Sequence, residues 1–461
     1  DSRLLAKDMH SYSNQGAYAS HGHAIAANGL TSWRLQYACP NIRGEAYTIY
    51  TNTPVGGAMR GYGIPQVCFA IESFMDDVAN EIHMDPLEFR RKNLIQGYYE
   101  DAYLKPIAAN TNGIFECLEK GAEYIHWDEK RKEYAEQTGD VRKGVGMALF
   151  SYKTGVWPIS LEIAGARLSL NQDGSVQLML GATEIGQGAD TVFSQMVAET
   201  LHTDMEHVHI KTVQDTDVSP FDTGAYASRQ SFVTGTAVRH CAEILRDKIL
   251  AYAKTLLPEI DTRELTLKDN WIWAGDEQAI SLAALAEESY YSLTNSSVLT
   301  VEVSEQVKKN TIATGCCFAE VEVDIKLGKI KILHIINVHD SGKLLNPQLA
   351  EMQVHGGMSM GMGYGISEQL ILDEKTGRPL NGNLLDYKLM TMLDTPDIKA
   401  DFVELCDPMG PYGNKALGEP PAIPCAPAIR NAVLHATGVA FYENPLTPQR
   451  LIDGFQKAGL I

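Results

Sequence analysis

Residues 413–421 read Gly413-Asn414-Lys415-Ala416-Leu417-Gly418-Glu419-Pro420-Pro421 and hold a single carboxylate between a glycine and two prolines. A proline disfavours the α region for the residue before it, so Pro420 predicts an extended Glu419. Pro421 stiffens the next position, and Gly418 lets another backbone or a ligand approach. The pattern suits a positioned base. Taken alone, however, it favours a turn that ends a strand, with Lys415 and Glu419 as a surface pair.

The composition is that of a globular chain of 461 residues, 44% hydrophobic and 21% charged, long enough for two or three domains. A formal net charge of -19 argues against nucleic acid or an anionic membrane as the main partner. No apolar run approaches the ~20 residues that span a bilayer. Eight cysteines without a C-x-x-C motif fit reduced thiols in a cytoplasm. The pairs His21/His23 and His207/His209 have no third ligand nearby, so no metal is expected there.

A glycine-rich loop in residues 51–66 carries one permanent charge, Arg60. Its planar guanidinium suits an oxyanion or phosphate, and the alternative is a tight loop whose arginine caps a helix C-terminus. Apolar residues at helical spacing over 67–82 predict a helix directly after the loop, and a helix N-terminus is a natural place for an anion. A second helix is predicted to open at Asp85 and Pro86, the N-cap and first helical position.

Two further loops of small and polar residues also precede predicted helices. Strands over 166–170 and 175–180 flank an Asn-Gln-Asp-Gly turn, and the second runs into the glycine-rich stretch 181–191. The loop 223–231 precedes a long helix predicted over 233–257. Neither loop matches a dinucleotide or Walker A fingerprint, which disfavours NAD and ATP. Three such loops in one chain predict helix N-termini that converge on a large anionic ligand.

The last third of the chain predicts more strands and helices. A hairpin is predicted from 316–323 and 330–338, a strand over 398–405 and a helix over 426–436. Five glycines with methionines in 356–365 indicate either close helix packing or a helix against a flat cofactor. Core packing is the commoner explanation.

In this order the motifs resemble those of the molybdenum hydroxylases, the family of xanthine dehydrogenase and aldehyde oxidase. The resemblance covers roughly the C-terminal two-thirds of the family's molybdopterin-binding subunit. Residues 58–66, Ala-Met-Arg-Gly-Tyr-Gly-Ile-Pro-Gln, resemble F-R-G-F-G-G-P-Q, and residues 184–188, Glu-Ile-Gly-Gln-Gly, are similar to E-M-G-Q-G. Residues 227–230, Ala-Ser-Arg-Gln, match a loop beside the metal and the pterin. Residues 414–421 resemble S-K-A-V-G-E-P-P.

The resemblance implies a role for each matching residue. Glu419 would be the catalytic base, Tyr62 and Trp157 would face the substrate, and Arg60 and Ala227 would lie near molybdenum without being ordinary protein ligands. The residues expected to bind the cofactor are Arg60, Gly61, Ile185, Gly186, Gln187, Gly188, Ala227, Ser228, Arg229, Gln230, Met360 and Lys415.

The chain also departs from the family pattern. Met360 stands where many members have a glutamine that touches the pterin, and Asn28 falls where purine-oxidising members carry a substrate-binding arginine. The segment around Val156, Trp157 and Pro158 differs from the xanthine oxidase pattern. The family's G-G-x-G-G-K loop and its N-terminal hammerhead-like domain are missing, and we expect them upstream or in a partner chain.

The implied fold is α/β (α+β), with two mixed-sheet molybdopterin-binding domains of which the first is incomplete. We expect the C-terminal part of the first domain in residues 1–115, a connection in 116–143 and the second domain, with the glutamate loop, in 144–461. The implied cofactor is molybdenum-molybdopterin, with the cytosine dinucleotide form left open. A [2Fe-2S] cluster and FAD would sit on partner chains or domains. The expected partners are an iron–sulfur subunit, an FAD subunit and the chain or segment with the missing part, and the expected location is the cytoplasm.

The implied reaction is hydroxylation of an electron-poor carbon of an aromatic N-heterocycle, with water as the oxygen source. Purines such as xanthine and hypoxanthine, or nicotinate, are the expected substrates. The alternatives are an aldehyde oxidoreductase, a reductive relative that acts on an aromatic acyl-CoA, and a subunit kept for assembly or scaffolding. Intact Glu419, Arg60 and Gln187 argue against the last.

Overall fold

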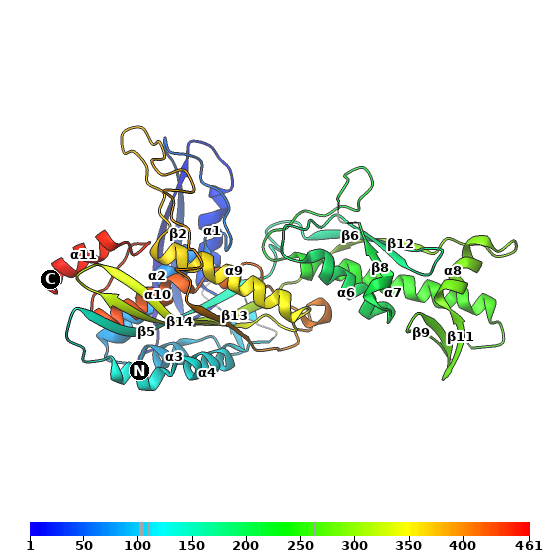
Figure 1. The fold of residues 1–461 in the computed structure, drawn as a ribbon, viewed down its shortest axis with the longest axis horizontal. Helices are drawn as coiled ribbons and strands as arrows, with labels where there is room; N and C mark the ends of the chain where they lie inside the picture. The colour runs from blue at the N-terminus through cyan, green and yellow to red at the C-terminus, as the bar shows by residue number, and fades with distance from the viewer. Residues whose placement is uncertain (101–105, 109–110, 212, 262–263) are drawn as a thin grey trace.

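A four-stranded sheet forms the centre of the larger of two lobes (Figure 1). The structure is a computed structural model that describes residues 1–100, 106–108, 111–211, 213–261 and 264–461. The strand order is β15-β14-β13-β5, antiparallel except for the parallel pair β14/β15. These strands are β5 (Val141–Lys153), β13 (Ile312–Asp324), β14 (Lys329–Asp340) and β15 (Asp397–Phe402). The predicted hairpin and the strand near residue 400 are confirmed.

Helices cover both faces of this sheet, because its strands are apolar on both sides. Successive side chains of a strand point to opposite faces, so Cys316 and Phe318 join one core while Cys317 and Ala319 join the other. The first core is closed by α2 (Ile64–Glu81), α3 (Pro86–Asn93), α4 (Ile114–Ile125) and α5 (Trp127–Glu133). The second is closed by α9 (Pro347–Ile366), α10 (Cys425–Thr437) and α11 (Pro448–Lys457).

The smaller lobe has its own sheet, in the order β12-β6-β7-β8, and its own core. Leu170 pairs with Val176 across the predicted hairpin. The helices α6 and α7 pack on this sheet, and a small three-stranded sheet with α8 completes the lobe (Figure 1). The elements are β6 (Ile163–Leu170), β7 (Val176–Leu180), α6 (Ala189–Leu201), β8 (Val208–Ile210), α7 (Gln230–Leu256), β9 (Leu265–Lys268), β10 (Trp271–Ala274), β11 (Glu277–Ser281), α8 (Leu282–Tyr291) and β12 (Thr300–Gln306).

The first fifty residues form a β-α-β unit that the sequence did not indicate. The strands β1 (Ala6–Gly16) and β2 (Asn41–Tyr50) run parallel, and α1 (Gly22–Trp33) connects them. The sequence of this unit shows no clear strand pattern, because serine, asparagine, aspartate and histidine occupy positions in β1 where apolar residues would mark a strand. A short pair, β3 (Tyr98–Glu100) and β4 (Pro106–Ala108), follows further along the chain.

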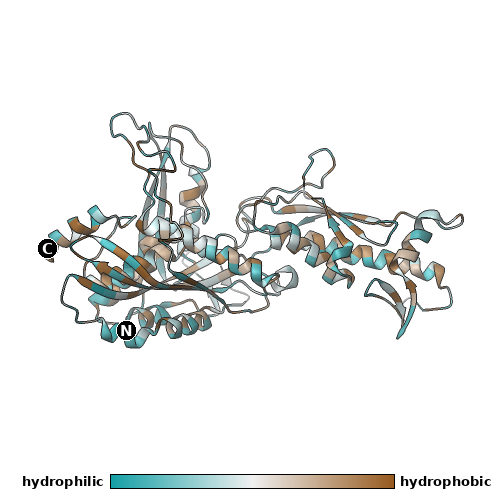
Figure 2. Ribbon diagram, viewed as in Figure 1, coloured by the Kyte–Doolittle hydropathy of each residue, from teal (hydrophilic) through white to brown (hydrophobic). Residues whose placement is uncertain are grey.

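The helices predicted over 67–82, from Asp85, over 233–257 and over 426–436 are confirmed, with starts within about three residues of expectation, whereas the helix indicated by 356–365 begins earlier, at Pro347. Asp85 caps α3 by accepting the N–H groups of Leu87 and Glu88. The stretch 116–143, expected to be a connection, contributes α4 and α5 to a buried core. Figure 2 shows apolar residues concentrated on the strands of both sheets and on the helix faces against them. Within the described ranges, no helix combines the length and apolar character needed to cross a bilayer.

Candidate active site

Glu419 lies at the start of a single 3-10 turn, η4 (Pro420–Ala422), with φ −98° and ψ −35°. The extended conformation predicted from Pro420 is therefore wrong. The Glu419 N–H donates to Ser228 Oγ at 3.0 Å, and its carbonyl accepts the Ala422 N–H at 3.3 Å. These bonds outweigh the steric preference against the α region before proline. Gly357 of α9 lies against this turn, where an added Cβ would meet Pro421 Cβ at 2.4 Å, so close packing explains that glycine.

Three segments hold the Glu419 carboxylate. Oε1 accepts the Gly61 N–H at 3.3 Å, and Oε2 accepts the Ser228 hydroxyl at 3.1 Å and the Tyr152 hydroxyl. Burial and the neighbouring carboxylate raise the pKa of Tyr152 well above its usual range, so the hydroxyl remains a donor. The 51–66 loop, the 223–229 loop and strand β5 thus meet at one half-buried carboxylate.

Arg60 joins this site to α9. Its Nε donates to the Gly418 carbonyl at 2.6 Å, its Nη2 donates to the Gln353 carbonyl at 2.8 Å, and its Nη1 lies 3.9 Å from Met360 Sδ. Gln353 is in the middle of α9, so Arg60 does not cap a helix C-terminus. Burial lowers the pKa of Arg60, and the charge of Glu419 opposes that shift. Arg60, Met360 and Glu419, distant in sequence, therefore form one group.

Several site residues have backbone conformations that L side chains rarely adopt. Tyr62, Ala227 and Ser228 have φ angles of 43°, 48° and 49°. Such strain persists where surrounding contacts impose it, and it clusters at functional sites. Asn28 imposes it at Tyr62, because its amide donates to the Tyr62 carbonyl at 3.0 Å. The Tyr62 hydroxyl lies 2.9 Å from Nδ1 of His21.

The loop before α6 is closed by its own glutamate. Glu184 accepts the N–H groups of Gly186 at 2.7 Å, Gly188 at 3.1 Å and Asp190 at 3.1 Å. Burial alone would raise the pKa of Glu184, but these bonds outweigh it and lower the pKa. The expectation that this loop offers those N–H groups to a ligand does not hold. The loop instead meets the start of α7, where Gln187 Nε2 donates to Gln230 Oε1 at 2.6 Å, and it leaves Ile185 exposed.

Two of the predicted cofactor-binding side chains are buried in ion pairs. Arg229 contacts Glu162 at 2.5 Å and Asp222 at 2.6 Å, and Lys415 contacts Asp340 at 2.8 Å. Because the Lys415 ammonium is fully buried with Asp340, the surface pair of Lys415 with Glu419 is excluded. Trp157 is half-buried on a segment joined to the 223–229 loop by the bond from the Gly155 N–H to the Ala227 carbonyl, 2.9 Å long.

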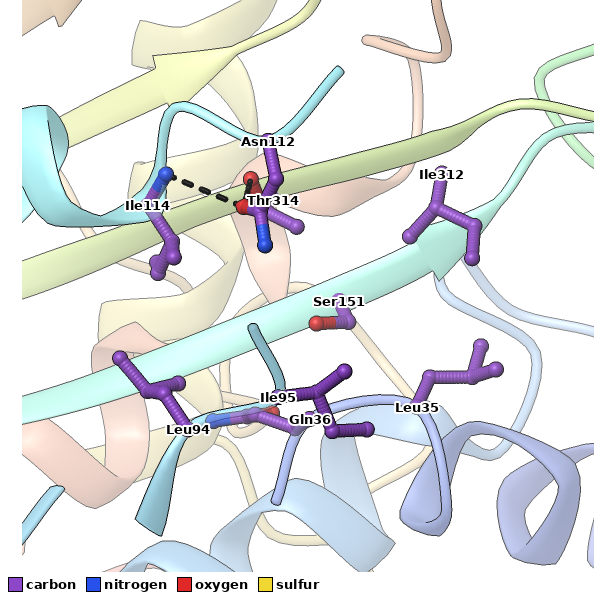
Figure 3. A pocket seen from close by; sticks show the side chains of 9 residues that line it. All are labelled: Leu35, Gln36, Leu94, Ile95, Asn112, Ile114, Ser151, Ile312 and Thr314. Atoms are coloured by element: carbon purple, nitrogen blue, oxygen red, sulfur yellow. Dashed lines mark hydrogen bonds between the residues drawn. The ribbon is translucent and has the colours of Figure 1, made fainter. Parts of the chain in front are cut away.

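Tyr152 and Gln353 are the site residues that the sequence analysis missed. Tyr152 lies in the apolar strand β5, where it is indistinguishable by pattern from a core residue. The one available signal is chemical, since a buried tyrosine hydroxyl must find a partner. A small cavity elsewhere, lined in part by Asn112, Ser151 and Thr314, includes none of the predicted site residues (Figure 3).

The residues around Glu419 suit a cofactor that brings its own metal ligands. Among the described residues, no group of three His, Cys, Asp or Glu side chains could hold a metal ion. The site offers the positive charge of Arg60 and the N-termini of α2 and α7, which no side chain in the described part of the protein caps. Gly57 and Gly186 leave the backbone open, since an added Cβ would meet no atom within 4 Å. Positive charge and N–H donors beside open backbone fit an anionic, phosphate-bearing group.

Comparison with known families agrees with this chemistry. Residues 120–396 and residues 1–94 match two family models that are both described as molybdopterin cofactor-binding domains. The chain belongs to the family of molybdopterin cofactor-binding domains.

The similar proteins are subunits of molybdenum enzymes. The xanthine dehydrogenase molybdenum-binding subunit of Escherichia coli O157:H7 is 47% identical over 466 residues, which are 100% of this chain and 61% of the relative. The aldehyde oxidoreductase molybdenum-binding subunit PaoC of E. coli K12 is 28% identical over 91% of this chain and 55% of the relative. The structure of quinoline 2-oxidoreductase from Pseudomonas putida 86 superposes with a TM-score of 0.89 at 23% identity, over 99% of this chain and 61% of that chain. These matches confirm the resemblance to the molybdenum hydroxylases.

Proposed function

We propose that the chain forms part of the molybdopterin site of an oxidoreductase that hydroxylates an electron-poor ring carbon of a purine such as xanthine. The observation that carries the proposal is the Glu419 carboxylate, held by two loops that bear the family's motifs and by Tyr152. The identity of 47% to a xanthine dehydrogenase subunit over the whole chain supports the purine. The chain spans 61% of that relative's length, so the complete reaction belongs to a larger protein or complex.

The protein's share of this chemistry is to hold a base and a charged cofactor. When bound, molybdopterin supplies a metal centre that takes two electrons from the substrate. Glu419 takes up the proton released as the new carbon–oxygen bond forms. Three donors keep its carboxylate in one orientation, which spares the reaction the entropy of positioning it. Arg60 adds positive charge beside it.

The substrate pocket is proposed to include Tyr62 and Trp157. Asn28 does not reach toward a substrate, because its amide holds the Tyr62 carbonyl. Our proposal therefore includes no arginine at this position that binds a purine. The aromatic rings and the remaining pocket would have to select the substrate by shape and stacking.

The electrons must leave the site, and we propose iron–sulfur and FAD partners for this path. A cytoplasmic location is part of the same proposal, supported by eight cysteines that form no disulfide. The pterin would be held by Arg60, Gln187, Gln230 and the backbone of residues 227–228. In this proposal Arg229 and Lys415 position those loops through their buried ion pairs.

The test is Glu419→Gln in the complete enzyme complex, with Glu136→Gln, an exposed glutamate, as the matched control. We expect kcat with xanthine to fall about 10²- to 10⁴-fold for Glu419→Gln and to be unchanged for the control. Molybdenum content, measured by metal analysis, should equal that of the wild type in both. Turnover near the wild-type rate in Glu419→Gln with full metal content would contradict the assignment of the base.

The substrate is tested separately by comparing kcat/KM for xanthine, hypoxanthine, nicotinate and an aromatic aldehyde. The aldehyde is included because PaoC, an aldehyde oxidoreductase subunit, is 28% identical. A kcat/KM for xanthine or hypoxanthine at least 10-fold above the others is expected. A preference for the aldehyde would replace the purine in the proposal.

A further inference from the structure

The carboxylate of Glu419 is held by residues from both lobes. Gly61 and Tyr152 belong to the larger lobe, whereas Ser228 lies in the loop just before α7 in the smaller lobe. The Ser228 hydroxyl contacts Glu419 twice, because it accepts the Glu419 N–H at 3.0 Å and donates to Oε2 at 3.1 Å. Figure 1 shows the two lobes side by side with a narrow neck between them. A change in the angle between the lobes would therefore separate Ser228 from Glu419.

Tyr412 reaches from the chain of the larger lobe into the smaller lobe shortly before Glu419. It lies in the 3-10 turn η3 (Pro411–Gly413), and its ring packs against the core of the smaller lobe. Its hydroxyl donates to the Met196 carbonyl of α6 at 2.8 Å and also contacts the Thr200 hydroxyl. Burial raises the pKa of Tyr412, so the hydroxyl stays protonated and remains a donor. Polar and apolar contacts thus hold this side chain on α6.

The chain directly after Tyr412 is held by the larger lobe. The Lys415 ammonium pairs with Asp340 at the end of β14, and the Lys415 N–H donates to the Ser341 carbonyl at 2.8 Å. Tyr412 itself has φ 56° and ψ 18°, in the left-handed region that L side chains rarely adopt. Such strain persists where the surroundings impose it. Here the side chain is fixed in one lobe while the residues that follow are fixed in the other.

A second contact joins α6 to the larger lobe. Asn346 caps α9, because its side-chain oxygen accepts the Leu349 N–H at 3.0 Å, and its amide nitrogen donates to Gln195 Oε1 of α6 at 3.1 Å. Leu349 also lies against the N-cap of α6, where a Cβ added to Gly188 would meet Leu349 Cδ1 at 2.6 Å. We call Tyr412 and Asn346, with their partners in α6, the α6 latch.

We propose that the α6 latch sets the distance between the Glu419 carboxylate and the cofactor-binding loops of the smaller lobe, which makes Tyr412 a positioning residue for the base. The inference rests on the proposed function, in which Gln187 and Gln230 hold the pterin. The helix α6 begins directly after the loop with Gln187, and Gln187 donates to Gln230 Oε1 at 2.6 Å. A latch on α6 therefore fixes both loops, and a displacement of about 1 Å between reacting groups can lower a rate about 10²-fold.

The first test compares Tyr412→Phe with Tyr252→Phe in the complete enzyme complex. Tyr252 is the matched control, because it is a buried tyrosine of α7 whose hydroxyl donates to the Asn295 carbonyl at 3.0 Å within the smaller lobe. We expect kcat with xanthine to fall about 10-fold for Tyr412→Phe, with KM and molybdenum content unchanged, and to keep its wild-type value for Tyr252→Phe. Urea unfolding should shift the midpoint by similar amounts in both. Equal falls in kcat would overturn the proposal.

Hydrogen exchange tests the latch without turnover. The Glu419 N–H reports the contact between the lobes, because it donates to Ser228, whereas the Lys415 N–H donates to Ser341 within the larger lobe. In Tyr412→Phe the Glu419 amide should exchange at least 10-fold faster than in the wild type, with the Lys415 amide unchanged. Both amides should exchange at wild-type rates in Tyr252→Phe. A Glu419 amide that exchanges at the wild-type rate in Tyr412→Phe would overturn the latch.

Asn346→Ser removes the second contact of the latch. Serine still caps α9 but is too short to reach Gln195. We expect faster exchange of the Glu419 amide in this variant, and still faster exchange when it is combined with Tyr412→Phe. Wild-type exchange in the double variant would overturn the proposal. If the wild-type complex oxidises none of the purines, the proposed function fails, and the exchange rates still decide whether the latch holds the two lobes together.

Discussion

Arg60 and Arg229 occupy similar places in the sequence, each in a loop of small residues just before a helix, yet the structure uses them differently. Arg229 is fully buried between two carboxylates, Glu162 and Asp222. Arg60 is only partly buried and donates mainly to backbone carbonyls. Around Arg229 one cation and two carboxylates are buried together inside the protein, whereas Arg60 is only half-buried beside the single carboxylate of Glu419.

The difference shows that a family motif can contain both structural and chemical residues. Removing one member of a closed ion-pair group leaves its partners buried and unpaired, which is costly to stability. Removing a side chain from the half-buried group of Arg60 and Glu419 should lower the free energy of unfolding only slightly and should lower the enzyme activity more. The following predictions test this division, from the largest expected change in stability to the smallest.

The largest effect is expected for Arg229→Met. It leaves the carboxylates of Glu162 and Asp222 buried without a cation, so we expect the free energy of unfolding to fall by about 3–5 kcal/mol. Urea unfolding followed by circular dichroism measures this change. Arg239→Met, within the helix α7 that Arg229 precedes, is the matched control. Its exposed i,i+4 pair with Glu243 should be worth no more than about 1 kcal/mol, and equal losses in the two variants would erase the comparison.

The surroundings of Arg60 predict an acid-sensitive site. His339 is completely buried beside the rings of Phe150 and Phe402, and its ring nitrogens have no hydrogen-bond partner among the residues that the structure describes. Burial, with the positive charge of Arg60, lowers the pKa of His339 to about 3. The unfolded chain, with a histidine pKa of about 6.5, then binds the proton first as the pH falls. The contribution of neutral His339 to the free energy of unfolding is fully present above about pH 6.5 and is lost progressively as the pH falls to about 3.

At pH 5 the loss should reach about 2 kcal/mol relative to pH 7. Unfolding of the wild type and of His339→Phe at both values measures it, because phenylalanine keeps the ring and cannot titrate. The pH-dependent loss should be smaller in the variant by about that amount. An identical loss in the two proteins would show that His339 takes no part in it.

Arg60→Met should destabilise the chain less than Arg229→Met does. It removes the hydrogen bonds to the Gly418 and Gln353 carbonyls, each worth about 1 kcal/mol. The carboxylate that loses its neighbouring positive charge, Glu419, is only half-buried. We expect a loss of about 1–2 kcal/mol together with a lower molybdenum content in the complete enzyme. A loss as large as that of Arg229→Met, measured in the same urea titration, would mean that both arginines are structural.

The division between the two arginines could not be predicted from the sequence, although much of the fold could. Hairpins, helix caps and amphipathic helices depend on neighbouring residues, and the signals at Asp85 and at Leu170–Val176 are of this kind. The burial of Lys415 depends on Asp340, and the conformation of Glu419 depends on Ser228, far away in the chain. Long-range partners leave no local pattern. The strand β1 gave no signal because polar residues stand where apolar ones would mark a strand.

The smallest change in stability is expected for Tyr152→Phe, which tests how the open site works. The substitution removes one donor from Glu419 Oε2 and leaves Ser228 on that oxygen and Gly61 on the other. We expect a loss of about 1 kcal/mol in stability, but about a 10-fold fall in kcat with KM and molybdenum content unchanged, because the base is then less well oriented. Steady-state kinetics of the complete enzyme with xanthine measures this split.

Tyr134→Phe is the matched control, since Tyr134 is also a buried tyrosine that donates to a carboxylate, Glu320 Oε1 at 2.8 Å, outside the site. Its stability loss should be similar and its kcat unchanged. If both variants lose activity equally, the contact of Tyr152 with Glu419 is only structural. If only Tyr152→Phe loses kcat, the hydroxyl orients the base, and the open group around Arg60 and Glu419 extends into the central sheet.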